Sequence, residues 1–95
     1  MHTFEERYEW DEKKSIANEA KHGVAFADAV DVFQDTRAVV LLDDHPDEER
    51  YLLLGIDGLL RLIVVAYTWR GDAVRLISAR KATSSEARLY AAENP

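Results

Sequence analysis

The hydrophobic pattern of the chain changes its period near residue 38, and this change restricts the folds that the chain can adopt. Four runs rich in valine, isoleucine, leucine and tyrosine follow, at residues 38–42, 51–56, 60–68 and 73–79. The turn signals between them are His45-Pro46-Asp47, Asp57-Gly58 and Arg70-Gly71-Asp72. Because connections this short join antiparallel neighbours, we predict a four-stranded antiparallel meander. The third run is apolar at both parities, so both of its faces should be covered.

Helical signals come before and after the meander. Asp11 is placed to cap a helix that ends at Lys21, and Gly23 supplies a left-handed stop. The apolar stripe that predicts the packing face of this helix is Ile16, Ala17 and Ala20. The residues expected to point elsewhere are Lys13, Lys14, Asn18 and Lys21. A second helix is predicted from the helical spacing of Phe26, Ala29, Val30 and Phe33. The pattern Thr83-x-x-Glu86 is a capping box that opens a last helix.

These elements predict an α+β fold with two N-terminal helices, the antiparallel meander, a C-terminal helix and a short additional strand at Tyr8-Glu9-Trp10. A length of 95 residues suits one domain, residues 1–95. The chain has no cysteine, which excludes disulfides, thiolate metal sites and a cysteine nucleophile. The N-terminus lacks an apolar signal core and the longest apolar stretch, residues 62–67, is too short to span a membrane, so we expect a cytoplasmic protein.

The chain is acidic overall, with 18 acidic and 12 basic residues and a net charge of −6. This balance argues against bulk attraction to nucleic acid. The charge is uneven, however: residues 23–60 hold nine acids and two bases, a net of −7, whereas residues 61–90 hold six bases and two acids, a net of +4. The asymmetry predicts two differently charged surfaces and, with them, two partners. An ordinary mixed surface is the alternative.

The hairpin at Arg70-Gly71-Asp72 sorts the arginines into two clusters. A turn there places Thr68 opposite Arg75, and Arg80 opposite about Ile63. At roughly 3.3 Å per residue, Arg70 and Arg80 then lie on the order of 25–30 Å apart, so they do not share a site unless the sheet is strongly coiled. The predicted cluster at one end is Arg61, Arg80 and Lys81. The predicted cluster at the other end is Arg50, Arg70 and Arg75.

The cluster of Arg61, Arg80 and Lys81 comes directly before the last helix and is suited to phosphate. Guanidinium groups match phosphate oxygens, and the free amides at a helix start add partial positive charge. The alternative is that both arginines end strands and pair with Asp57 and Glu86. The charge pattern alone favours this alternative.

Two titratable residues are candidates for proton transfer. His22 suits an acid or base near neutral pH, although its place at a helix C-terminus also explains it. Glu86 is a candidate base that the capping box already explains. The histidine spacings of metal sites are absent, and so are the signatures of a serine nucleophile and of phosphate-binding glycine loops. The residues therefore predict neither a metal site nor a cofactor.

Several motifs, taken in order, resemble the BrnT family of toxins. The first half of the chain carries Trp10-Asp11-x-x-Lys14, Asn18-x-x-Lys21-His22-Gly23-Val24-x-Phe26 and Ala29-x-x-Val32-Phe33-x-Asp35. The second half carries Glu49-Arg50-Tyr51, Gly55, Val65-x-Tyr67-Thr68-x-Arg70-Gly71, Ile77-Ser78-Ala79-Arg80-Lys81-Ala82-Thr83 and Glu86-x-x-x-Tyr90. The resemblance runs from about Trp10 to Tyr90, which is nearly the whole chain.

The resemblance implies a fold similar to RelE toxins and an endoribonuclease of a type II toxin–antitoxin system. Such a toxin needs neither metal nor cofactor and cleaves RNA by attack of the ribose 2′-hydroxyl on the adjacent phosphate. The implied partner is a BrnA-like antitoxin with a ribbon-helix-helix domain. The toxin is then expected to form a heterotetramer with an antitoxin dimer, and to meet operator DNA only through the antitoxin.

Residue by residue, the resemblance carries over the catalytic candidates Lys21, His22, Arg70, Arg80 and Glu86. The two arginines are expected to stabilise charge on the phosphate, His22 or Glu86 to transfer protons, and Lys21 to attract the substrate. If Arg70 and Arg80 do not converge, Arg61 replaces Arg70. Arg61 and Lys81 are the expected RNA-binding residues.

Two other functions stay open at this point. The chain is a non-catalytic antitoxin-binding module that acts as a co-repressor, or it is a metabolic enzyme or small-ligand binder. The acidic net charge suits the first of these. The second has no cofactor motif to support it.

Overall fold

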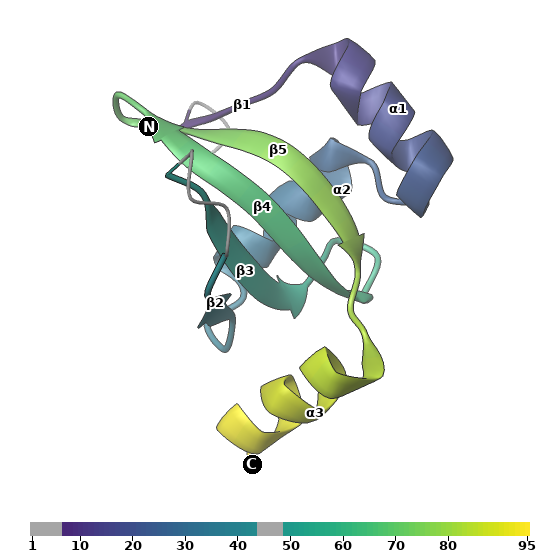
Figure 1. The fold of residues 1–95 in the computed structure, drawn as a ribbon, viewed down its shortest axis with the longest axis vertical. Helices are drawn as coiled ribbons and strands as arrows, with labels where there is room; N and C mark the ends of the chain where they lie inside the picture. Colours follow the sequence, from purple (N-terminus) through teal and green to yellow (C-terminus); the bar gives the residue numbers. More distant parts are fainter. Residues whose placement is uncertain (1–6, 44–48) are drawn as a thin grey trace.

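A five-stranded mixed sheet organises the chain. The structure, a computed structural model, describes residues 7–43 and 49–95, so the predicted turn at His45-Pro46-Asp47 lies outside the described residues. The strands are β1 (Tyr8–Glu9), β2 (Val39–Leu41), β3 (Tyr51–Ile56), β4 (Leu62–Arg70) and β5 (Ala73–Lys81). Their order in the sheet is β1-β5-β4-β3-β2 (Figure 1). Strands β2 to β5 form an antiparallel meander, and β1 adds to β5 in parallel. The predicted α+β class and the short additional strand are thus confirmed.

The helices flank this sheet on different sides. They are α1 (Glu12–His22), α2 (Phe26–Ala29), the 3-10 helix η2 (Val30–Gln34) and α3 (Ser84–Glu93). The predicted second helix is therefore a single α-turn that continues as a 3-10 helix. Figure 1 shows α1 beside β5, α2 behind the sheet, and α3 beyond the end at which β5 stops. In the described part of the chain, no helix is long and apolar enough to cross a membrane.

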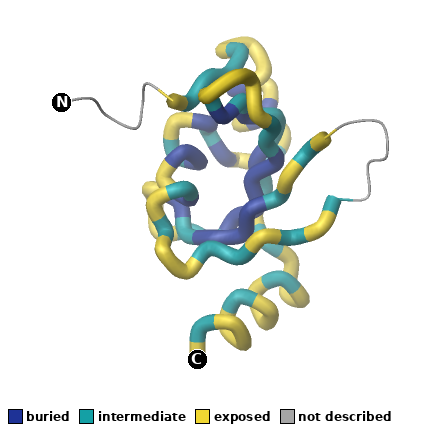
Figure 2. Tube along the Cα trace, turned by 90° about the vertical axis from the view of Figure 1, so that its left-hand side faces the viewer, coloured by how far each residue is buried: buried dark blue, intermediate teal, exposed yellow. Residues whose placement is uncertain are grey.

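The core lies between the sheet and the α2–η2 segment. Phe26, Val32, Val65 and Leu76 are among its fully buried side chains, and Figure 2 shows the buried positions gathered in the middle of the molecule. In β4 the four consecutive residues 63–66 are all buried. The prediction that both faces of this strand are covered is confirmed. Burial of this apolar surface is the main favourable contribution to folding.

The predicted packing face of α1 is wrong. Ile16 is 63% exposed, whereas Ser15 and Asn18 are buried. The Ser15 Oγ accepts a hydrogen bond from the Phe26 backbone N at 3.1 Å. The face of α1 that meets the fold therefore contacts backbone polar groups, which need hydrogen-bond partners when they are buried. Polar side chains supply those partners, and the apolar stripe is left facing outward.

A β-bulge changes the predicted register of the long hairpin by one residue. Thr68 lies opposite Arg75, as predicted, but Arg80 lies opposite Val64 rather than Ile63. The pairing shifts between Ala66 and Tyr67, so that Ile77 has no partner on β4. An extra residue on one strand has this effect because it moves every later pair along by one.

Helix α3 is held to the sheet by polar contacts, since none of its residues is buried. The predicted capping box is confirmed: the Glu86 N donates to Thr83 Oγ1 at 3.1 Å, and the Thr83 N donates to Glu86 Oε1 at 2.9 Å. Further along, the Tyr90 hydroxyl donates to Asp35 Oδ2 at 2.7 Å. The capping box closes the first turn of α3, and the Tyr90 contact attaches the helix to Asp35 at the end of η2.

Candidate functional site

The turn that ends α1 brings Lys21 and His22 to the edge of the sheet beside β5. Gly23 adopts a φ of 76°, which a residue with a side chain rarely tolerates, and its N–H donates to Glu19 O at 2.8 Å. This is the left-handed stop predicted from the sequence. It turns the chain sharply, so that the last residues of α1 remain at the surface.

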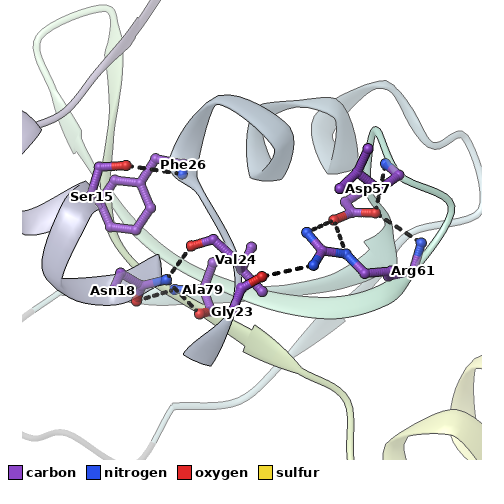
Figure 3. Close-up of polar contacts among 9 residues, drawn as sticks. Ser15, Asn18, Gly23, Val24, Phe26, Asp57, Arg61 and Ala79 are labelled. Atoms are coloured by element: carbon purple, nitrogen blue, oxygen red, sulfur yellow. Dashed lines mark hydrogen bonds and ion pairs between the residues drawn. The ribbon is translucent and has the colours of Figure 1, made fainter. Parts of the chain in front are cut away.

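Asn18 fixes that turn against the sheet. Its Nδ2 donates to Val24 O and to Ala79 O, both at 2.8 Å, and its Oδ1 accepts from Ala79 N at 3.1 Å (Figure 3). The carboxamide is buried. Three hydrogen bonds in a buried environment hold the α1 turn and β5 in one relative position.

A shallow cleft of about 250 Å³ opens between α1 and β5. Its walls include Lys14, Lys21 and His22 from the helix and Ile77 and Ser78 from the strand. The bulge at Ile77 gives this stretch of β5 its irregular outline. Lys14 and Lys21 are exposed and His22 is partly exposed, so the cleft is cationic and open to solvent.

Arg80 lies one step beyond the cleft. Ser78 and Arg80 are two residues apart on β5, so their side chains point to the same face of the sheet, about 7 Å apart along the strand. Ser78 is part of the cleft wall. Along this face of β5, from the cleft toward the start of α3, Arg80 is therefore the first arginine.

Arg80 forms a two-pronged ion pair with Glu86. The guanidinium donates through Nη1 to Oε1 at 2.8 Å and through Nη2 to Oε2 at 2.9 Å. The Arg80 hydrogen bonds are the largest cause that lowers the pKa of Glu86, from 4.5 to about 2. In turn, hydrogen bonding from Glu86 raises the pKa of Arg80. At neutral pH both groups are charged, and Glu86 is too weak a base to take up a proton readily.

Arg61 is tied into the turn between β3 and β4. Its Nε and Nη2 contact Asp57 Oδ2 at 2.9 and 2.7 Å, and its Nη1 donates to Gly23 O at 2.8 Å (Figure 3). Asp57 is only 3% exposed. The arginine–carboxylate pairs that the sequence offered as the alternative to phosphate binding are thus both present, at Arg61 with Asp57 and at Arg80 with Glu86.

Arg70 lies at the other end of the hairpin. It is opposite Ala73, whereas Arg80 is opposite Val64, and six residues of β4 separate the two positions, about 20 Å of strand. The Nε of Arg70 lies 3.7 Å from Glu9 Oε1. The same carboxylate oxygen lies 3.4 Å from the Arg75 Nη1. The structure therefore does not bring Arg70 together with the other sequence-predicted site residues.

The predicted residues that do gather are Lys21, His22, Arg61 and Lys81, around the Gly23 turn, with Arg80 and Glu86 beside them. Lys81 belongs to this group because its Nζ lies 4.0 Å from the position that a Cβ would take at Gly23. Residues 7–43 and 49–95 hold no group of three or more histidine, aspartate or glutamate side chains arranged to bind a metal ion.

Sequence reasoning did not single out Lys14 and Ser78 as site residues. Lys14, Asn18 and Lys21 follow each other at spacings of four and three, which places them on one side of α1. That spacing was a usable signal for Lys14. The signal for Ser78 was its place two residues before Arg80, which puts both side chains on one face of the strand.

The fold and this end of the sheet define a class of small α+β proteins in which a mixed sheet is followed by a C-terminal helix and a histidine and several cations lie at an open cleft. The sequence model of the family described as "Ribonuclease toxin, BrnT, of type II toxin-antitoxin system" matches residues 10–86. The chain belongs to this family.

One solved structure supports the assignment independently. The chain is similar to the crystal structure of the Brucella abortus ribonuclease toxin BrnT, with 34% sequence identity and a TM-score of 0.64. The match covers 79% of this chain and 94% of that one. No match was found among the curated proteins.

Proposed function

We propose that this chain is an endoribonuclease toxin that cleaves RNA in the cleft at His22. The observation that carries the proposal is that His22 shares one open cleft with Lys14 and Lys21, next to the face of β5 that bears Arg80. His22 is also the single histidine among the residues that the structure describes. Membership of a family of ribonuclease toxins supports the same conclusion.

The reaction we propose is attack of the ribose 2′-hydroxyl on the adjacent phosphate, without metal or cofactor. The 2′-oxygen bonds to phosphorus while the bond to the 5′-oxygen breaks, which leaves a 2′,3′-cyclic phosphate and a 5′-hydroxyl. His22 takes the proton from the 2′-hydroxyl, since histidine is the side chain that most often acts as a general base. Water in the open cleft gives a proton to the 5′-oxygen, and the hydroxide that remains takes the proton held by His22, which returns the histidine to its starting state.

The cations have distinct parts in this proposal. Lys21 and Arg80 stabilise the negative charge that builds up on the phosphate oxygens, and Lys81 attracts the RNA backbone. Glu86 positions Arg80 through the two-pronged ion pair and transfers no proton, because its pKa is held near 2. Arg61 shapes the site through Gly23 rather than contacting RNA.

We propose further that the antitoxin is a BrnA-like protein with a ribbon-helix-helix domain. Two copies of this chain then bind an antitoxin dimer, and the complex meets operator DNA only through the antitoxin. We place the chain in the cytoplasm, where its RNA substrate is. The match to a toxin–antitoxin family supports the existence of such a partner.

The proposed activity is tested with the purified chain and a fluorescent RNA oligonucleotide in the presence of a chelator. We expect cleavage that leaves a cyclic phosphate, and a rate at least 100-fold lower in His22→Gln, because general base catalysis typically contributes 10²–10⁴-fold, roughly. Lys21→Ala is compared with Lys13→Ala, an exposed lysine of the same helix that does not line the cleft. Unchanged cleavage in His22→Gln, or full loss on chelation, contradicts the mechanism.

One observation favours the non-catalytic alternative. Every arginine proposed from the sequence for RNA contact has a carboxylate partner: Arg61 with Asp57, Arg70 with Glu9 and Arg80 with Glu86. In this case the chain binds the antitoxin and assists repression without cutting RNA. Intact RNA at high concentrations of a folded chain that still binds its antitoxin would support this function instead.

A further inference from the structure

The turn between β3 and β4 presents two leucines to solvent. Leu59 is 59% exposed and Leu60 is 84% exposed. Leu60 also has a φ of 63°, and it is the one non-glycine residue with a positive φ in the described chain. A leucine in this left-handed conformation is strained, and so exposed a side chain gains little packing in return. We call Leu59 and Leu60 the leucine knob.

The leucine knob is held rigidly by the residues around it. Asp57 Oδ1 accepts hydrogen bonds from Leu59 N at 3.0 Å and from Arg61 N at 2.8 Å. Asp57 O accepts from Leu60 N at 3.0 Å. On the other side, Gly58 N donates to Asp28 O at 3.1 Å, and a Cβ at Gly58 would collide with the Asp31 carboxylate. The backbone that carries the two leucines is thus fixed, which lowers the entropy cost of binding a partner.

The leucine knob lies next to the candidate site. The Arg61 guanidinium joins the knob's turn to the Gly23 turn, which follows Lys21 and His22, at 2.8 Å (Figure 3). Lys81 is beside the same glycine. One flank of the knob is therefore cationic, through Lys21 and Lys81, and the other flank is acidic, through Asp28 and Asp31.

We propose that the leucine knob is the apolar anchor for the antitoxin, which seats it in an apolar groove and covers the His22 cleft. The charges require antitoxin carboxylates on the side of Lys21 and Lys81, and antitoxin cations on the side of Asp28 and Asp31. This inference rests on the proposed toxin function, since it names where the inhibitor of that same cleft binds. A central apolar anchor with a charged rim is the usual arrangement of a tight protein interface.

The observations favour a protein partner of different sequence. Leucine offers neither hydrogen bonds nor an aromatic face, which are the features that RNA binding uses. A second copy of this chain would have to set its Lys21 and Lys81 flank against the Asp28 and Asp31 flank of the first copy, and the dimer measurement below tests that arrangement. We commit to the antitoxin as the occupant because the chain belongs to a toxin–antitoxin family.

The test uses the full chain and, as probe, the BrnA-like antitoxin with a ribbon-helix-helix domain that is proposed above. The variant Leu59→Asn with Leu60→Asn removes the apolar knob, and asparagine tolerates a positive φ. The control is Leu42→Asn, which changes a leucine that is 93% exposed elsewhere on the surface. We expect the knob variant to bind the antitoxin at least tenfold more weakly, and the control to bind within twofold of wild type.

Three further measurements make the test decisive. The thermal midpoint of the knob variant is expected to be no lower than that of wild type, because asparagine relieves the strain at position 60. Its RNA cleavage without antitoxin is expected to be unchanged, while the antitoxin no longer suppresses it. Antitoxin affinity within twofold of wild type overturns the inference, and so does an equal loss in Leu42→Asn. A toxin dimer in light scattering that the knob variant converts to monomer also overturns it. If wild type and all variants fail to cleave RNA, the proposed ribonuclease function is contradicted. The inference about the leucine knob is still tested, because antitoxin affinity is measured independently of cleavage.

Discussion

The Asn18 carboxamide pairs with the Ala79 backbone as a neighbouring strand would. The Nδ2 donates to Ala79 O at 2.8 Å, and Oδ1 accepts from Ala79 N at 3.1 Å. Residue 18 is in α1 and residue 79 is in β5, so one side chain satisfies the strand where α1 takes the place of a further strand. The position of His22, four residues after Asn18, depends on this contact.

We predict that Asn18→Ala destabilises the fold by about 2–3 kcal/mol, because it leaves the buried amide of Ala79 without its partner. Urea unfolding followed by circular dichroism measures the change. Glu19→Ala, the exposed neighbour on the same helix, is the control and should unfold within about 0.5 kcal/mol of wild type. Equal midpoints for Asn18→Ala and wild type would show that Asn18 does not hold the α1 turn.

Because Glu86 is paired with Arg80, we predict that the fold loses stability in acid when this carboxylate becomes protonated. Its pKa is about 2 in the folded chain, below its usual value of 4.5, so its contribution is fully present above about pH 4.5 and is lost as the pH falls toward 2. The free energy of unfolding of wild type should therefore fall more steeply over this range than that of Glu86→Gln. Thermal unfolding at a series of pH values measures both slopes. Parallel curves would contradict the assignment.

Tyr90→Phe should loosen α3 without unfolding the sheet. The variant loses the 2.7 Å hydrogen bond to Asp35, while Asp35 still accepts from the backbone of Ile56 and Arg37. Hydrogen exchange of the α3 amides is expected to be several-fold faster, with the β4 amides unchanged. Arg88→Ala, on the exposed side of the same helix, is the matched control. The same exchange rates in Tyr90→Phe and Arg88→Ala would count against this anchor.

The strain at Leu60 predicts a stabilising substitution. Glycine accepts a positive φ freely, so Leu60→Gly should raise the free energy of unfolding by up to about 1 kcal/mol, the strain relieved being partly offset by the flexibility of glycine when unfolded. Chemical denaturation measures the difference. A clear loss of stability would mean that Leu60 packs within the chain.

The family resemblance places Arg70 among the catalytic residues, whereas the structure places it far from the other candidates. Mutation of Arg70 distinguishes these two assignments. Because it lies about 20 Å of strand from Arg80, we expect Arg70→Ala to keep RNA cleavage within about twofold of wild type. Arg80→Ala should reduce cleavage at least tenfold, since a cation that stabilises developing charge is lost. Equal losses in the two variants would place Arg70 in the site.

Much of this fold could be predicted because its signals are local. Asp11 and Gly23 mark the ends of α1, Thr83 and Glu86 mark the start of α3, and the strand runs are separated by short turns. The packing face of α1 was predicted wrongly because Ser15 and Asn18 are buried through hydrogen bonds to Phe26 and to a strand that begins more than fifty residues later. The periodicity of a helix reflects the spacing of its apolar residues, so polar residues buried by such contacts do not show in it.

A smaller part of the candidate site than of the fold could be predicted from the sequence. Lys21 and His22 follow from the helix end, but the cleft also needs the bulge at Ile77, which no residue pattern marks. The same bulge moves Arg80 to a position opposite Val64. The carboxylate partners of Arg61 and Arg80 were available from the sequence as an alternative, because Asp57 and Glu86 lie four and six residues away.

The most direct test of the central claim is inducible expression of the chain alone in bacteria that lack its antitoxin, with growth and the 5′ ends of total RNA as readouts. We expect growth arrest and new RNA ends that carry 5′-hydroxyls, both abolished in a folded His22→Gln variant and both preserved in Lys13→Ala. Normal growth with intact RNA, at confirmed soluble expression of wild type, would contradict the account.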